Sequence, residues 1–479
     1  MPVAPQHPFR APLPYLFALV ALGACAGPDP RPLELDRLAR EVAARGDLLG
    51  RGAAALELAD LRALPFERPV LEEAPAYDRG AFWQACALAF NGELRSARRR
   101  WAEAGGRARA GGAAAATELE IEQTGFEAGE RETWMALTFD VLGLFDAGRS
   151  AAARDLAQAE ARTAWADVEG AAWAARIAVD RARAELGAAL EQGELLAELL
   201  ASSSPSAARA ELLFERGRLT EGDRARLFGM VHEVQGELGR AQLDVLEHRR
   251  ALADAAGLPP GAPALDGPTR ATLDDLLQAA EPPSLPEARE LLDRSPELRR
   301  ARLEYAVAEA VLRDEVAETR LGLRLGPALQ VGPDDTLPGG VLAIDFPRAH
   351  ALSGRVAAAH EARERMREEL EEALRASLAR IDASQGELAA MQRELAEHAL
   401  PRAAETDVAW RAASARFAVD PLAADALGTA LRDRAMALLA LSGMRRDVVL
   451  AWLDLQAVIG PAPRPLPGEE ALAAGEVAP

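Results

Sequence analysis

Four short stretches of the chain alternate between apolar and polar residues, the pattern of a β-strand with two different faces. The first two, TELEIEQTG from residue 117 and TWMALTFDVLGLF from residue 133, flank a glycine-containing turn. The other two, RLGLRLG from residue 320 and VLAIDF from residue 341, flank a turn rich in proline, glycine and aspartate. Each pair predicts a β-hairpin. The apolar positions predicted to share one face are Leu119, Ile121, Met135, Leu137, Phe139, Leu321, Leu323, Leu325, Leu342 and Ile344.

Long stretches of helical periodicity surround both predicted hairpins. After each hairpin the helical pattern continues to about Phe214 in the first half and about Phe417 in the second. About 65 to 70 helical residues make a rod of roughly 100 Å. In the second rod a left-handed supercoiled seam is predicted by apolar residues at every seventh position, Leu374, Ile381, Leu388 and Leu395. Pro401 interrupts this rod, and we expect it to kink the helix.

The two halves of the chain repeat each other. The helix start NGELRSARRRWAEAGG at residues 91–106 recurs as SPELRRARLEYAVAEA at residues 295–310, with an offset of 204. After the hairpins, Glu160 recurs as Glu361 at an offset of 201, and the ends of the long helices align at an offset of 203. Such offsets indicate an internal duplication. Each unit is predicted to be two antiparallel rods that meet at one tip, with a β-hairpin at the other end.

Composition and charge narrow the functional classes. Of 479 residues, 49% are apolar and 27% charged, so the chain can bury a substantial core. Aromatic residues make up only 5%, and the many small apolar residues suit closely packed helices. The formal net charge of -20 argues against nucleic-acid binding, which needs a basic surface. The acidic net charge of the chain at most favours the transport of cationic cargo.

The N-terminus suggests a location. A short apolar run, residues 13–22, is too short to span a bilayer and ends in LGAC, which resembles a bacterial lipobox. We therefore expect cleavage before Cys25 and lipid modification of its thiol. An ordinary secretory signal with a chance cysteine is the alternative. If Cys25 is acylated, Cys86 is the only thiol left and no intrachain disulfide can form.

Catalytic and metal-binding patterns are missing from the sequence. The six histidines never fall at i, i+4, and no His/Cys cluster has ligand spacing. No phosphate-binding glycine loop and no nucleophile elbow is present. We predict no enzyme activity, no metal site and no cofactor.

The order of these motifs resembles the TolC family of outer-membrane efflux proteins. Each unit holds an N/S-x-E-L helix start, a strand hairpin, an exit into a very long helix, a tip turn and a return helix. LFDAGR at residues 144–149 is similar to the family's exit motif, and FPR at residues 346–348 is a degenerate second copy. The resemblance covers nearly all of residues 80–460.

The resemblance implies a fold class, an assembly and a role. The fold would be mainly α with small β. Its tandem-duplicated long helical hairpins would form an α-barrel coiled coil. A β-hairpin inserted in each would contribute to a trimeric 12-stranded outer-membrane β-barrel. It implies a homotrimer that is lipid-anchored in the outer membrane and projects into the periplasm. The protein would be a passive exit duct of a tripartite efflux or type I secretion system. Its partners would be a periplasmic adaptor and an inner-membrane RND or ABC pump.

The family's tip turns contact the adaptor, and acidic residues near them constrict the channel. The matching acids here are Asp223 and Asp425, which three copies would repeat into rings that attract cations. A solvated carboxylate on a helix surface is the alternative for each acid. Gly217 suits a sharp turn because glycine tolerates positive φ. The adaptor-contacting positions implied by the resemblance are Gly217, Arg218, Leu219, Thr220, Val419, Asp420, Pro421 and Leu422.

These observations divide the chain into six parts. They are a lipoprotein signal peptide (1–24), an N-terminal periplasmic extension (25–79), repeat 1 (80–257), an inter-repeat linker (258–284), repeat 2 (285–460) and a disordered tail (461–479). One alternative is a periplasmic coiled-coil lipoprotein scaffold without a barrel, because the alternating runs are shorter than the roughly 9–11 residues of a membrane strand. An adaptor is a second alternative, but the two helical hairpins count against it.

Overall fold

The computed structural model describes most of the chain between residues 80 and 461. The described ranges are 80–113, 117–125, 131–140, 149–269, 271–280, 286–319, 322–331, 336–345 and 349–461. All of them belong to one of the two units into which contacts divide the chain, residues 46–479. Predictions that concern residues 1–79, the exit motif at residues 144–148, Leu321, the second copy of that motif at residues 346–348 and residues 462–479 lie outside the described residues.

Each half begins with helices, crosses two strands and then runs through longer helices. The first half contains α4 (Gly80–Phe90), α5 (Gly92–Ala113), β1 (Thr117–Gly125), β2 (Arg131–Asp140), α7 (Arg149–Glu215) and α8 (Glu221–Ala256). The second contains α10 (Ala288–Arg294), α11 (Pro296–Glu318), β3 (Gly322–Val331), β4 (Thr336–Asp345), α12 (Ala349–Glu394), the π-helical turn η3 (Leu395–Ala399), α13 (Leu400–Phe417), η4 (Pro421–Ala423) and α14 (Ala424–Ile459). Between them lie η2 (Pro263–Asp266) and α9 (Ala271–Ala279).

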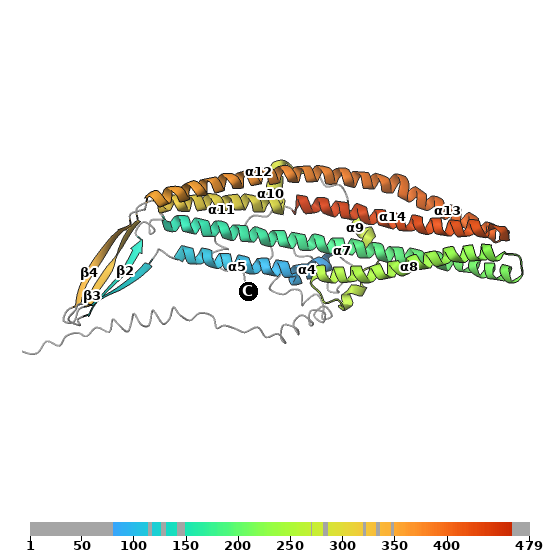
Figure 1. The fold of residues 1–479 in the computed structure, drawn as a ribbon, viewed down its shortest axis with the longest axis horizontal. Coiled ribbons are helices and arrows are strands. Elements are labelled where there is room, and N and C mark those ends of the chain that lie inside the picture. The colour runs from blue at the N-terminus through green and yellow to red at the C-terminus, as the bar shows by residue number, and fades with distance from the viewer. Residues whose placement is uncertain are drawn as a thin grey trace, which may run out of the picture. The chain divides into compact units, whose positions relative to one another are not determined.

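The helices of each half pack as predicted, with two shorter helices along one long rod. In the first half α5 and α8 follow one another alongside α7, a single helix of 67 residues (Figure 1). In the second half α11 and α14 lie along the rod formed by α12 and α13. This repeated arrangement confirms the duplicated helical hairpins. Among the described helices, none is both long and apolar enough to cross a membrane.

The heptad seam of the second rod lies inside the chain's own core. Ile381 and Leu388 are buried, and Leu374 and Leu395 pack partly buried against them. The other members of this core come from α10, α11 and α14, namely Leu291, Leu298, Val448, Ala451, Leu455 and Ile459. The seam therefore holds one protomer together.

The second rod is interrupted where Pro401 was expected to disturb it. Pro401 is the second residue of α13, and the five residues before α13 form the π-helical turn. Proline has no N–H to donate and crowds the preceding turn, so the regular i→i−4 ladder is lost just upstream.

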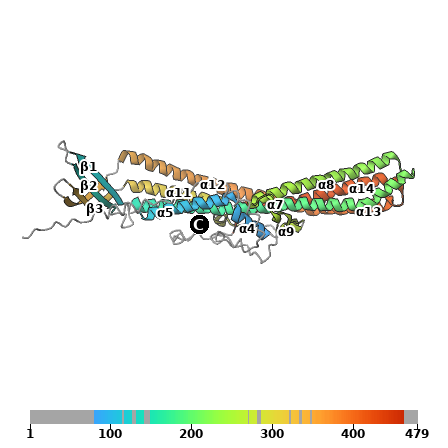
Figure 2. The same ribbon diagram turned by 90° about the horizontal axis from the view of Figure 1, so that it is seen from below.

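The four strands form one antiparallel sheet in the order β1-β2-β3-β4, beyond one end of the helices (Figure 2). β1 has nine residues and the others ten, and β3 and β4 are longer than the alternating runs RLGLRLG and VLAIDF that predicted them. The register pairs Phe139 with Leu325 and Leu325 with Leu342, so the predicted apolar positions share a face. Trp134 pairs with Gln330 and belongs to the opposite face.

The two halves are joined mainly through α7, which contacts both α11 and α14. Arg299 of α11 and Glu169 of α7 form a buried ion pair of 2.8 Å. Further along, the hydroxyl of Ser442 donates to the carbonyl oxygen of Ala188 at 3.3 Å. Such buried polar contacts fix the register between helices, because breaking one would leave a desolvated group unpaired.

Candidate functional site

The turn between α7 and α8 forms the first tip of the rods. Gly217 adopts φ 64°, a left-handed conformation that glycine accepts without strain, as predicted. Thr220 caps α8, because its hydroxyl accepts from the N–H of Asp223 at 3.1 Å. This geometry folds Leu219 back into the core of the tip, where its side chain is only 6% exposed. Leu219 therefore offers no apolar surface to a partner.

The turn between α13 and α14 forms the second tip and is built differently. Asp420 accepts from the N–H of Leu422 at 3.0 Å, and Pro421 starts the short helix η4. This turn leaves Leu422 82% exposed and Val419 85% exposed. Of the tip positions implied by the family resemblance, these two present the exposed apolar surface.

One arginine brings the two predicted constriction acids together. Arg226 of α8 lies 2.5 Å from Asp223 on its own helix and 3.5 Å from Asp425 on α14. The Thr220 hydroxyl donates to the Asp223 carboxylate at 2.7 Å. That hydrogen bond first, and the bond from Arg226 second, lower the pKa of Asp223 below its usual value of 3.8. The three charges thus link one helical hairpin to the other.

Beneath this bridge the two tips share an apolar core. It includes Leu213, Leu227, Trp410, Phe417 and Leu431, from four different helices. Gly428 of α14 meets Leu227 and Met230 of α8, and a larger side chain there would have to displace the sulfur of Met230. The close approach of α8 and α14 is what places Arg226 within reach of Asp425.

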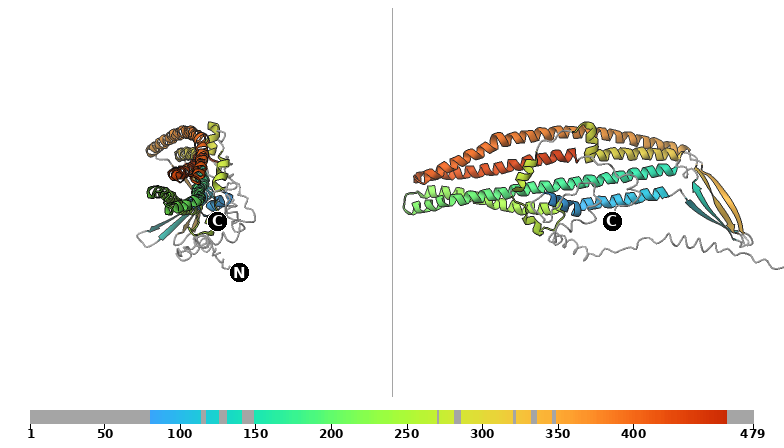
Figure 3. Two further views of the ribbon diagram at one scale, coloured as in Figure 1. Left: turned by 90° about the vertical axis from the view of Figure 1, so that its right-hand side faces the viewer. Right: turned by 180° about the vertical axis from the view of Figure 1, so that it is seen from behind.

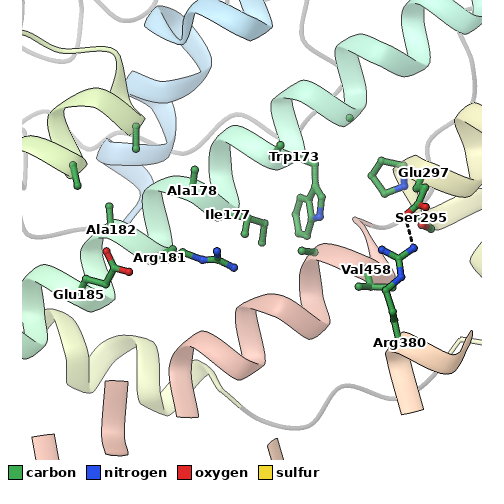
Figure 4. Close-up of a pocket in the computed structure, with 16 residues that line it drawn as sticks. Trp173, Ile177, Ala178, Arg181, Ala182, Glu185, Ser295, Glu297, Arg380 and Val458 are labelled. Atoms are coloured by element: carbon green, nitrogen blue, oxygen red, sulfur yellow. Dashed lines mark hydrogen bonds and ion pairs between the residues drawn. The ribbon is translucent and has the colours of Figure 1, made fainter. Parts of the chain in front are cut away.

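A pocket of about 550 Å³ lies midway along the helices (Figure 4). Its lining comes from α7, α8, α11, α12 and α14, and includes Trp173 and Ile177 beside the Glu297–Arg380 ion pair of 2.5 Å. The indole N–H of Trp173 is buried without a hydrogen-bond partner among the described residues. Asp180, two turns along α7 from Trp173, accepts from the side-chain amide of Gln84 of α4 at 2.7 Å. In Figure 3, α4, α9 and α10 lie on the same side of the long helices.

Groups suited to metal binding or covalent chemistry are rare in the described part of the chain. No cluster of three or more His, Cys, Asp or Glu side chains there is arranged to hold a metal ion. Cys86 is fully buried between α4 and α7, and burial raises the pKa of its thiol. A buried thiol with a raised pKa stays protonated and is a poor nucleophile.

Comparison with solved structures identifies the fold. The chain is similar to the MtrE outer membrane channel of Neisseria gonorrhoeae, with a TM-score of 0.65 and 16% identity over 80% of this chain and 89% of that one. It is also similar to the outer membrane protein VceC of Vibrio cholerae, with a TM-score of 0.64 and 17% identity over 80% of this chain and 96% of that one. For the CmeC channel of Campylobacter jejuni the TM-score is 0.64 and the identity 13%, over 84% of this chain and 91% of that one. No protein-family model and no curated protein sequence matches the chain. The expected fold of long duplicated helical hairpins with a small β-sheet is confirmed for this chain.

Proposed function

We propose that the chain is the outer-membrane channel subunit of an export system. It would act as a passive duct that an adaptor and an inner-membrane pump open at the tip. The register of the sheet carries this proposal. Apolar positions gather on one face of four strands whose nine or ten residues match the 9–11 needed to span a bilayer.

A single sheet of this kind is incomplete in a membrane. β1 and β4 are its edge strands, and an edge leaves unpaired backbone groups that lipid cannot satisfy. Closing the sheet with strands of other copies would pair these edges. Three copies would give the twelve-stranded barrel that the family resemblance implies, with the acid–arginine bridges repeated around the tip.

The location of the protein can be tested in cells. We expect it to fractionate with the outer membrane, and the mature chain to begin at an acylated Cys25. The apolar sheet face and two or more acyl chains would each oppose release into water. Density-gradient fractionation and mass spectrometry of the N-terminal peptide provide the measurement. Recovery of an unmodified chain in the soluble periplasmic fraction would contradict the proposal.

The proposed adaptor surface can be tested with the two tip leucines, because Leu422 is exposed and Leu219 is buried. A photo-crosslinker at position 422 should capture the adaptor, because Leu422 is exposed at the end of the rods. Leu422→Arg should abolish export and change the free energy of unfolding by less than about 0.5 kcal/mol.

The matched control is position 219, whose side chain is buried. A crosslinker there should capture no adaptor, and Leu219→Arg should destabilise the tip by roughly 2 kcal/mol or more. Capture at neither position in cells that require the protein for export would exclude an adaptor site at the tips.

A further inference from the structure

A second hollow, the α5–α12 groove, opens between α5, α7, α11 and α12 and has a volume of about 790 Å³. Its α7 residues, including Glu160 and Asp167, continue at helical spacing into those of the mid-helix pocket. Both hollows therefore lie along one face of α7. The volume is in the range of sites that hold small organic molecules.

The floor of the groove is apolar. Val307 and Val311 stand one turn apart on α11, and Met366 faces them from α12. Small side chains such as Ala164 keep the space between the helices open. These side chains are half-buried, so apolar surface remains for a ligand to cover.

The rim of the groove is acidic on balance. Five carboxylates line it against the three guanidinium groups of Arg100, Arg107 and Arg365. Arg107 and Arg365 pair with acids one turn away on their own helices. Arg300, which is not part of the lining, contacts two of these carboxylates, Glu304 at 2.9 Å and Asp167 at 3.4 Å. Even when Arg300 is included, the carboxylates at the rim of the groove outnumber the guanidinium groups.

We propose that the α5–α12 groove binds organic cations with an apolar body. The floor would take the body of such a molecule and the rim its charge, and an anion of the same shape would be repelled. The idea that cargo meets this groove during export rests on the proposed function; binding itself does not. The groove would then act as a station that enriches lipophilic cations along the duct.

The duplication supplies a matched pair for the test. Glu160 lines the groove, whereas its repeat counterpart Glu361 is exposed on α12 and does not line it. The probe is tetraphenylphosphonium, and tetraphenylborate is an anion of the same shape. Binding of both to the purified protein is measured by equilibrium dialysis against protein-free micelles of the same detergent.

We expect saturable binding of the cation and weaker binding of the anion. Glu160→Gln should weaken cation binding by about threefold, and high salt should weaken it further. Glu361→Gln should leave cation binding unchanged. Met366→Gln should weaken cation binding, because it makes the apolar floor of the groove more polar. Equal binding of cation and anion, or no effect of Glu160→Gln and Met366→Gln, would overturn the proposal. Channel recordings on the same preparation distinguish the binding proposal from the channel proposal. Conductance without cation binding would contradict only the binding site in the groove, and cation binding without conductance would contradict only the channel function.

Discussion

Replacing Leu388 by aspartate should destabilise the protein by roughly 3–5 kcal/mol. Leu388 is 2% exposed and packs in one core with residues of α10, α11 and α14. A carboxylate there would be desolvated among apolar side chains, and the loss of the leucine also leaves a cavity. Because this core joins the long rod to the return helix, the whole second half should loosen.

The control is Leu378→Asp on the same helix. Leu378 is 41% exposed, so the new charge would remain hydrated and the free energy of unfolding should change by less than about 1 kcal/mol. Thermal melting followed by helical circular dichroism compares the two variants. Equal melting temperatures for them would show that the seam is not packed within the protomer.

Much of the fold could be predicted because the relevant signals are local and repeated. The alternating runs located the hairpins. Because the chain is duplicated, an element predicted in one half was supported by its counterpart in the other half. The heptad positions Ile381 and Leu388 were rightly expected in a packed seam. The sequence did not reveal that the seam's partners include α10 and α14 of the same chain, because that depends on how the helices fold back.

The length of β3 was underestimated for a physical reason. β3 contains Gly326 and Pro327 in its interior, which interrupt the apolar alternation on which the prediction relied. Gly326 is required there because a Cβ would overlap the carbonyl oxygen of Leu137 on β2. Close backbone approach of this kind is visible only after the strands are paired.

The tip was predicted only in part. Asp223 and Asp425 do lie together, but Arg226, which bridges them, was not singled out. Its spacing of three residues from Asp223 was a local signal, whereas its contact with α14 required the tertiary fold. Leu219 and Leu422 occupy equivalent repeat positions, yet a left-handed glycine turn buries one and an aspartate–proline turn exposes the other.

The bridge predicts how the proposed channel should respond to mutation and to pH. Arg226→Ala removes the cation between the two acids, so the hairpins should separate more easily and the open fraction should rise by about twofold or more. Because its pKa is lowered, the Asp223 carboxylate stays ionised even somewhat below its ordinary pKa of 3.8. Its contribution to closure is therefore complete above that pH and is lost as the pH falls through the lowered pKa. Arg240→Ala is the control, because Arg240 pairs with Glu237 on its own helix.

Single-channel recording in a planar lipid bilayer tests the proposed function most directly. Purified wild-type protein should insert and conduct ions in discrete steps, with a low open fraction at neutral pH and a higher one in strong acid. Arg226→Ala should conduct more at neutral pH and lose the acid response, while Arg240→Ala should behave as the wild type does. If wild type and Arg226→Ala both insert but carry no current at any pH, the protein is not a channel.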